Sequence, residues 1–368
     1  MSVVPMEQLP RYLGRSKISC SALSITLFTL CLSFFAAPGC AQVAPFAFPG
    51  HKPADIPRTW RPLIGEYGPE QGSFTVLEKS GQLVLRKNDG TEISLQRAAG
   101  GTFTLNEPPG APLPVYFGGE VNGQAASISL GDVTFPRRML GPEEGQVFRI
   151  QPLRPIEALR QEAQDASPPH EDGQFRAPDL IDLASLDSSV HLDIRYATAN
   201  DFLATPVYTQ ARAFLQRPAA DALLRALFRL KPLGYGLLIH DAYRPWYVTK
   251  IFWDATPPEG KIFVADPAQG SRHNRGCAVD LTLYELKTGK PAQMPGTYDE
   301  MSPRSFPDYP GGTSLQRWHR DLLRWAMESE GFTVYEHEWW HFDFKDWHEY
   351  PILNVPFEKL HFNEKLVG

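Results

Sequence analysis

Two short segments in the C-terminal third of the chain combine the residue types that hold metal ions. The first covers residues 271–280 and includes His273 and Asp280, and the second is Glu338-Trp339-Trp340-His341. Two histidines and one carboxylate supply three ligands and leave one coordination position open, as metal-dependent hydrolases require. Zinc suits these donors because it is redox-inert and accepts nitrogen and oxygen ligands. The two segments therefore predict a hydrolytic metal centre.

The first segment leads into a predicted strand, residues 276–284. Because side chains alternate between the faces of a strand, Cys277 faces away from Asp280, which shares its face with the small Ala278. That leaves room beside the carboxylate for a second group, and His273 in the preceding loop can fold back to the same point. Cys277 is predicted to be a small buried side chain rather than a nucleophile.

The second segment has an unusual spacing for a strand. Glu338 and His341 are three residues apart, so a regular strand would place them on opposite faces. They share a site only if the chain bends at Trp339 and the strand begins at His341. A zinc ion held there would lower the pKa of a bound water to about 7. Glu338 would then act as the general base and later protonate the leaving amine.

The complete pattern resembles a known family. S-x-H-x-x-G-x-A-x-D at residues 271–280, followed by E-W-W-H at 338–341, is similar to the zinc D-alanyl-D-alanine dipeptidases of the VanX type. The resemblance spans about residues 180–360, roughly half of the chain, and includes further segments in the same order at 193–198, 241–245 and 280–284.

The resemblance implies a role for each matching residue. His273, Asp280 and His341 match the ligands of one zinc ion per chain, and Glu338 matches the general base. Arg244 matches the arginine that stabilises the oxyanion of the tetrahedral intermediate, a contribution of about 2.7–4 kcal/mol.

The resemblance also implies three substrate-binding or supporting positions, which are Tyr196, Asp241 and Ser271. The family carries an acidic residue shortly before an Arg-Ser-His run, where it holds the substrate amine. The corresponding run here is residues 301–306, with Ser302 at the usual acidic position. Asp299 or Glu300 is therefore expected to hold the amine.

Three alternative functions remain open at this stage. A D-Ala-D-Ala carboxypeptidase that trims peptidoglycan stem peptides would share the metal centre and have a more open substrate site. A non-haem iron oxygenase also uses two histidines and one carboxylate. Such enzymes usually place the first histidine and the acid about two positions apart, whereas His273 and Asp280 are seven apart. A non-catalytic wall-binding protein would not need the base and the arginine beside the ligands.

Composition limits the partners of the chain. Its 368 residues include 36 Lys and Arg and 42 Asp and Glu, for a net charge of −6. The lack of a basic excess to neutralise phosphates argues against a nucleic-acid partner. A small D,D-dipeptide is the ligand that the family resemblance implies. His240, His337 and His348 lie near the motifs but are expected to be packed or surface histidines. Arg272 and Arg275 are expected to be solvated loop charges.

The N-terminal segment predicts export. Basic residues precede an apolar stretch at 18–37 and then small residues, which is the order found in a signal peptide, here residues 1–41. Cleavage would release the protein to the periplasm or the medium. Alternatively, Cys40 would be the lipidated first residue of a lipoprotein.

The rest of the chain divides into three predicted parts. Short alternating strands with Gly-containing turns, at residues 55–152, predict a small β-sandwich or barrel that serves as an accessory domain and contacts the cell wall or envelope. Residues 153–178 are a predicted linker with one or two helical turns at 156–163. Residues 179–368 form the predicted zinc D,D-dipeptidase domain, an α+β fold with helices packed on a mostly antiparallel sheet. Helices are expected from Pro218 and over 315–330.

Overall fold

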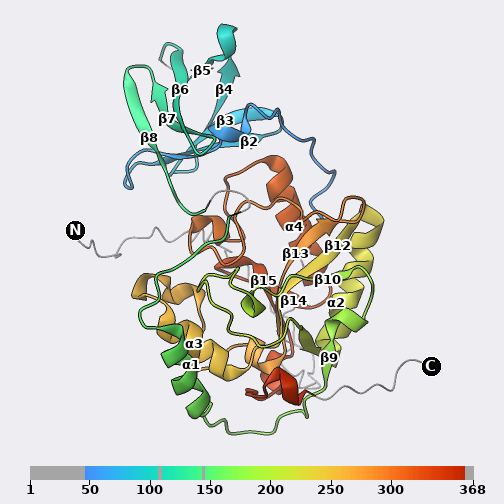
Figure 1. The fold of residues 1–368 in the computed structure, drawn as a ribbon. Helices are drawn as coiled ribbons and strands as arrows, with labels where there is room; N and C mark the ends of the chain where they lie inside the picture. The colour runs from blue at the N-terminus through green and yellow to red at the C-terminus, as the bar shows by residue number, and fades with distance from the viewer. Residues whose placement is uncertain (1–45, 107–109, 143–145, 361–368) are drawn as a thin grey trace, which may run out of the picture. The chain divides into compact units, whose positions relative to one another are not determined.

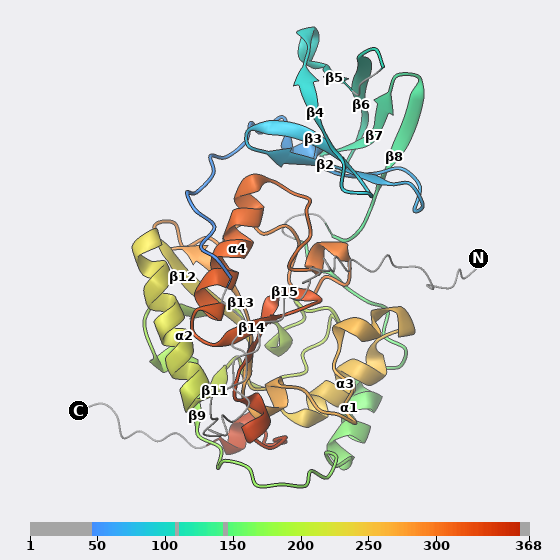
Figure 2. The same ribbon diagram turned by 180° about the vertical axis from the view of Figure 1, so that it is seen from behind.

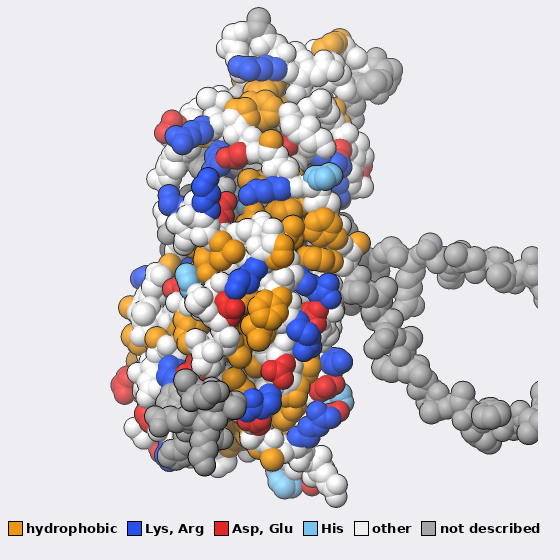
Figure 3. Space-filling view, turned by 90° about the vertical axis from the view of Figure 1, so that its right-hand side faces the viewer, with side chains coloured by type: hydrophobic (Ala, Val, Ile, Leu, Met, Phe, Trp, Pro, Cys, Tyr) orange, Lys and Arg blue, Asp and Glu red, His pale blue; other side chains and the backbone are white. Residues whose placement is uncertain are grey.

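The computed structural model describes residues 46–106, 110–142 and 146–360. The predicted signal peptide and Cys40 lie outside these ranges. Within them, none of the helices has the length and apolar character that crossing a bilayer requires. Lysine and arginine side chains are interspersed with aspartate and glutamate on the face drawn in Figure 3, in keeping with the small net charge.

A closed barrel follows the N-terminal segment (Figure 1). Each strand pairs antiparallel with the next, and the first also pairs with the last. The strands are β1 (Gly65–Tyr67), β2 (Phe74–Lys79), β3 (Gln82–Lys87), β4 (Glu92–Arg97), β5 (Phe103–Leu105), β6 (Leu113–Val121), β7 (Gln124–Leu130) and β8 (Val133–Arg138). The all-β domain is confirmed, and of the two predicted architectures the structure has the barrel.

Turn chemistry explains why the strands begin and end where they do. The β6–β7 hairpin turns at Asn122 and Gly123, whose φ angles are 53° and 76°. A two-residue hairpin turn of this kind requires positive φ at both positions, which asparagine and glycine tolerate. Inside the barrel, Val76, Leu83 and Ile128 are fully buried and supply the apolar core.

The predicted peptidase region is built around one five-stranded sheet. Its order is β10 (Val190–Leu192), β12 (Tyr235–Asp241), β13 (Ala278–Glu285), β15 (Glu338–Phe344) and β14 (Phe332–Tyr335). Only the β10–β12 pair is parallel among these five described strands. A short two-stranded sheet, β9 (Leu180–Asp182) with β11 (Phe214–Gln216), lies apart from it. The mostly antiparallel α+β fold is therefore confirmed.

Two helices, α2 (Arg217–Leu230) and α4 (Ser314–Glu328), pack against each other and against this sheet (Figures 1 and 2). Pro218 occupies the first turn of α2, where its missing N–H costs no hydrogen bond. Thr313 and Gln316 form a capping box at the start of α4. Both predicted helices are thus confirmed, with α4 ending at Glu328.

The segment predicted as a linker contains a complete helix, α1 (Ile156–Asp165), which packs against α3 (Trp246–Ala255). Ile156 and Leu159 are buried in the same hydrophobic core as the sheet and its helices. Further along, Glu171 pairs with Arg275 and accepts a hydrogen bond from the Ile352 amide. The prediction that Arg275 is a solvated loop charge is wrong, because it is 8% exposed and binds this segment. The domain boundary at residue 179 stays a prediction.

Candidate metal centre

The main-chain path brings the three predicted ligands to one point. Asp280 on β13 and His341 on β15 are paired neighbours in the sheet. His273 opens a short 3-10 turn that ends at Gly276, where φ is +67°. A Cβ at Gly276 would lie 2.5 Å from the Leu180 side chain, so glycine is needed to turn the chain back into β13.

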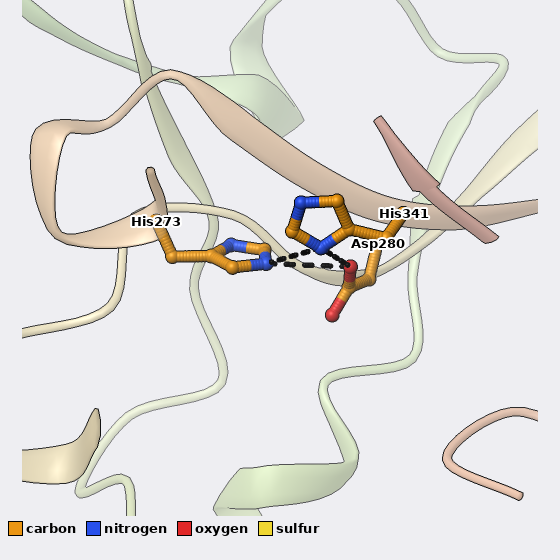
Figure 4. Close-up of side chains that lie close together, drawn as sticks. All are labelled: His273, Asp280 and His341. Carbon is orange, nitrogen blue, oxygen red and sulfur yellow. Dashed lines mark hydrogen bonds and ion pairs between the residues drawn. The ribbon is translucent and has the colours of Figure 1, made fainter. Parts of the chain in front are cut away.

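Three side-chain atoms converge at this point (Figure 4). His273 Nε2 lies 3.1 Å from His341 Nδ1 and 3.3 Å from Asp280 Oδ1, and His341 Nδ1 lies 3.1 Å from the same Asp280 oxygen. All three residues are buried. Burial raises the pKa of Asp280, but the two imidazoles outweigh it and hold this pKa well below its usual range.

The remaining contacts of the two imidazoles fix which nitrogens face inward as acceptors. His273 Nδ1 is 2.6 Å from the Ala242 carbonyl oxygen, and His341 Nε2 is 2.9 Å from Asp343 Oδ1. Carbonyl and carboxylate oxygens only accept, so each of these nitrogens carries the hydrogen. When both rings are neutral, as metal binding requires, the lone pairs of His273 Nε2 and His341 Nδ1 therefore point at each other and at Asp280 Oδ1, which has no hydrogen-bond donor among the described residues. A metal cation fits this set of converging acceptors.

Glu338 reaches the same point because β15 is irregular there. Val334 pairs with Phe342, yet Tyr335 pairs with Glu338, so extra residues of β15 bulge out of the ladder. The bulge brings Glu338 Oε2 to 3.7 Å from His341 Nδ1 despite the spacing of three. The predicted bend is confirmed, although the strand begins at Glu338 itself. Burial raises the pKa of Glu338 to about 8, although His341 acts to lower it.

Arg244 and Asp241 lie side by side at the end of β12. The Arg244 guanidinium is 2.8 Å from Asp241 Oδ2 and 3.7 Å from Asp280 Oδ2. Tyr208 donates a 2.7 Å hydrogen bond to the other Asp241 oxygen. Asp241 therefore holds Arg244 in place, whereas Arg244 itself reaches the cavity beside the metal point.

A cavity of about 100 Å³ opens onto the three converging atoms. Among the predicted substrate-binding residues, Tyr196 and Ser271 line it. Asp299 lines it as well, with one oxygen accepting a 2.8 Å hydrogen bond from the Tyr196 hydroxyl. Its second oxygen is buried without a hydrogen-bond partner among the described residues. Burial, together with the nearby Asp280, raises the pKa of Asp299 well above its usual range.

Glu300 also borders this cavity, but its carboxylate is already occupied. It pairs with Arg304 at 2.6 Å and accepts a hydrogen bond from the Thr297 amide. Ser302, which stands where the family carries its acid, caps a short turn by accepting a hydrogen bond from the Arg304 amide. Of the two expected amine-binding residues, Asp299 is thus the one that lines the cavity and has a carboxylate oxygen without a hydrogen-bond partner among the described residues.

Sequence reasoning did not find two residues beside the ligands. The Tyr298 hydroxyl lies 3.1 Å from Asp280 Oδ2, and the Tyr298 ring stacks on His240, which is a packed histidine as expected. Asp343 contacts His341 from behind. The only sequence signal for Asp343 is its spacing of two from a predicted ligand on one strand, while Tyr298 lies in a loop that gives no such signal.

The fold and the three converging acceptor atoms, with a buried carboxylate and an arginine beside them, fit a metallopeptidase. The sequence comparisons then identify the family. A model described as D-ala-D-ala dipeptidase matches residues 176–361, which is half of the chain. The chain therefore belongs to the D-ala-D-ala dipeptidase family, which is zinc-dependent.

Individual relatives agree with this assignment. The D-alanyl-D-alanine dipeptidase of Escherichia coli (strain K12) is 34% identical over 175 residues, which cover 48% of this chain and 89% of the relative. The Enterococcus faecalis (strain ATCC 700802 / V583) protein of the same name is 34% identical over 192 residues, 47% of this chain and 91% of its own. That of Streptomyces coelicolor (strain ATCC BAA-471 / A3(2) / M145) is 34% identical over 186 residues, 46% of this chain and 92% of its own.

Proposed function

We propose that this protein is a zinc D-alanyl-D-alanine dipeptidase of the cell envelope, with one zinc held by His273, Asp280 and His341. The observation that carries the proposal is the convergence of three acceptor atoms within 3.3 Å of one another, with the Glu338 carboxylate beside them. Zinc, when bound, supplies a Lewis acid that polarises the scissile carbonyl and makes a water nucleophilic near neutral pH.

Glu338 transfers the proton in this reaction, and Arg244 stabilises the charge that develops. The Glu338 carboxylate takes the proton of the attacking water and then gives it to the nitrogen of the leaving D-alanine. Burial raises the pKa of Glu338, and a cation at the neighbouring metal point would lower it again, so the carboxylate is available as a base when zinc is bound. The Arg244 guanidinium is held by Asp241 and stabilises the negative charge that develops on the former carbonyl oxygen.

The cavity favours a dipeptide over a longer chain. The second oxygen of Asp299 is buried without a hydrogen-bond partner among the described residues, and a substrate ammonium would satisfy it. Tyr196 positions Asp299 by donating to its other oxygen, and Ser271 lines the same space. A stem peptide has an acylated nitrogen at this position and cannot form the ion pair, which argues against the carboxypeptidase alternative.

Export and the barrel are further parts of the proposal. The basic, apolar and small-residue order of residues 1–41 supports delivery to the periplasm or the medium. Lipidation at Cys40 is the alternative way in which the same signal would be processed. A D,D-dipeptidase acts on wall-derived material, so an envelope location would place it beside its substrate. The barrel is then the part of the chain available for contact with the wall or envelope.

The decisive experiment measures metal and turnover on the same protein. We expect one zinc per chain in the purified protein that begins at residue 42, together with release of D-alanine from D-Ala-D-Ala. The His273→Ala and His341→Ala variants should lose nearly all of both. Iron in place of zinc would favour the oxygenase alternative. Normal zinc content in both variants would refute the site.

A further inference from the structure

Asp343 lies directly behind one of the three converging ligands. It follows His341 by two residues on β15, so both side chains leave the strand on the same face. The Asp343 Oδ1 atom is 2.9 Å from His341 Nε2, on the side of the ring opposite to the atom that faces Asp280. Only 15% of the Asp343 side chain is exposed, so water competes weakly for this hydrogen bond.

We infer that Asp343 is a positioning residue that fixes the tautomer and ring orientation of His341 for metal binding, an inference that rests on the proposed function. A neutral imidazole carries its hydrogen on either nitrogen, and only the tautomer with hydrogen on Nε2 leaves Nδ1 free as a ligand. The Asp343 carboxylate accepts from Nε2–H and therefore selects that tautomer. Carboxylates placed behind ligating histidines typically change metal affinity about 10- to 100-fold.

The two histidines differ in how their orientation is secured. His273 donates its outer N–H to the Ala242 main-chain carbonyl, an acceptor that no substitution at position 242 removes. His341 depends on a side chain, so its orientation is set by one replaceable residue. The pair thus offers an internal comparison, because a change at Asp343 alters the support of one ligand and leaves that of the other intact.

Arg272 completes the arrangement. Its Nε is 3.5 Å from Asp343 Oδ2, and its guanidinium lies 4.8 Å from the centre of the Trp347 ring. The arginine therefore balances the Asp343 charge and restrains the carboxylate from its outer side. The expectation that Arg272 is only a solvated charge is incomplete, since 43% of its side chain is exposed while the rest packs against these partners.

The test measures the zinc affinity of the metal-free protein by competition with a chelator, which reports on the ligands without any turnover. We expect Asp343→Ala to weaken zinc binding about 10- to 100-fold. Asp343→Asn keeps an oxygen that accepts from Nε2–H, so it should recover part of that loss. Affinity of the Ala variant within twofold of wild type would overturn the inference. If the Ala variant does not fold, Asp343→Leu takes its place, because leucine fills a similar volume and offers no acceptor for Nε2–H; affinity of that variant within twofold of wild type would overturn the inference equally.

Glu336→Gln is the matched control. Glu336 is exposed on the turn between β14 and β15. Its replacement by glutamine removes one negative charge, as Asp343→Asn does, at a residue that does not contact a ligand. An equal loss of affinity in Glu336→Gln and Asp343→Asn would show a long-range charge effect and overturn the hydrogen-bond inference. The outcomes also separate the two proposals. A wild-type protein that binds no zinc contradicts the proposed function, whereas normal binding in Asp343→Ala contradicts only the positioning role.

Discussion

Replacing Asp299 by asparagine tests substrate recognition at a single atom. The change keeps the size of the side chain and an oxygen that can accept from Tyr196, but it removes the charge that faces the cavity. Breaking a buried ion pair by removing one partner costs about 3–5 kcal/mol. Since each 1.36 kcal/mol is tenfold in rate, kcat/KM for free D-Ala-D-Ala should fall by roughly a hundred- to several-thousand-fold.

The structure indicates that the fall in kcat/KM lies near the lower end of that range. Burial and the nearby Asp280 raise the pKa of Asp299, so part of the attraction to the ammonium goes into ionising the carboxyl group. N-acetyl-D-Ala-D-Ala carries no ammonium and gains nothing from the charge, so its kcat/KM should change far less. The assay is the ratio of kcat/KM for the free and acetylated dipeptides in wild type and variant.

A neighbouring carboxylate supplies the control for this prediction. Glu300→Gln loses the ion pair with Arg304 and should lower stability, while the preference for the free dipeptide persists. An unchanged ratio in Asp299→Asn would refute the assignment of the amine to this residue. A wild-type preference for the acetylated or longer peptide would replace the dipeptidase with the carboxypeptidase.

Three further predictions concern catalysis and architecture. Glu338→Gln should keep its zinc and lose about 10²–10⁴ in kcat, and retained activity would remove its role as base. Arg244→Ala should also keep zinc and lose about 2.7–4 kcal/mol of transition-state stabilisation, seen mainly in kcat; a change confined to KM would assign it to ground-state binding. A fragment from Gln151 keeps α1 and every proposed catalytic residue, so it should retain turnover. A fragment from Asp179 lacks α1 and two large buried side chains worth about 1.5–3 kcal/mol each, so equal stability of the two fragments would contradict the packing argument.

Regular strand geometry made part of the site predictable. Alternation predicted that Asp280 and Cys277 face opposite sides, and Cys277 indeed lies in the hydrophobic core while Asp280 lies with the two histidines. The spacing between Glu338 and His341 was informative because it conflicts with alternation, and a conflict of that kind predicts a bulge when both residues must share a site. Short strands and Gly turns likewise predicted an all-β domain.

Features that depend on distant parts of the chain could not be predicted. Asp299 has a φ of +61° and binds Tyr196, which is 103 residues away in the chain. The local sequence reveals neither feature and therefore does not distinguish Asp299 from Glu300. Closure of the barrel rests on pairing between β1 and β8, which the local pattern of strands and turns does not specify. The packing of α1 on α3 depends on apolar side chains of a helix about 90 residues further along the chain, and the sequence of the predicted linker does not indicate that partner.

The distance along the chain between the two histidines has a consequence for how the protein reaches its native state. His273 and His341 are 68 residues apart, and they meet only after β13 and β15 have paired across the intervening helix. Contacts that close such long loops form slowly, because the entropy of loop closure is lost before any interaction is gained. An unfolded chain therefore offers no ready-made site, and zinc would bind the native state almost exclusively. Under the proposed function, free zinc at 100 times its dissociation constant would stabilise the fold by about 2.7 kcal/mol, so the melting temperature of the protein would follow the metal supply of its surroundings.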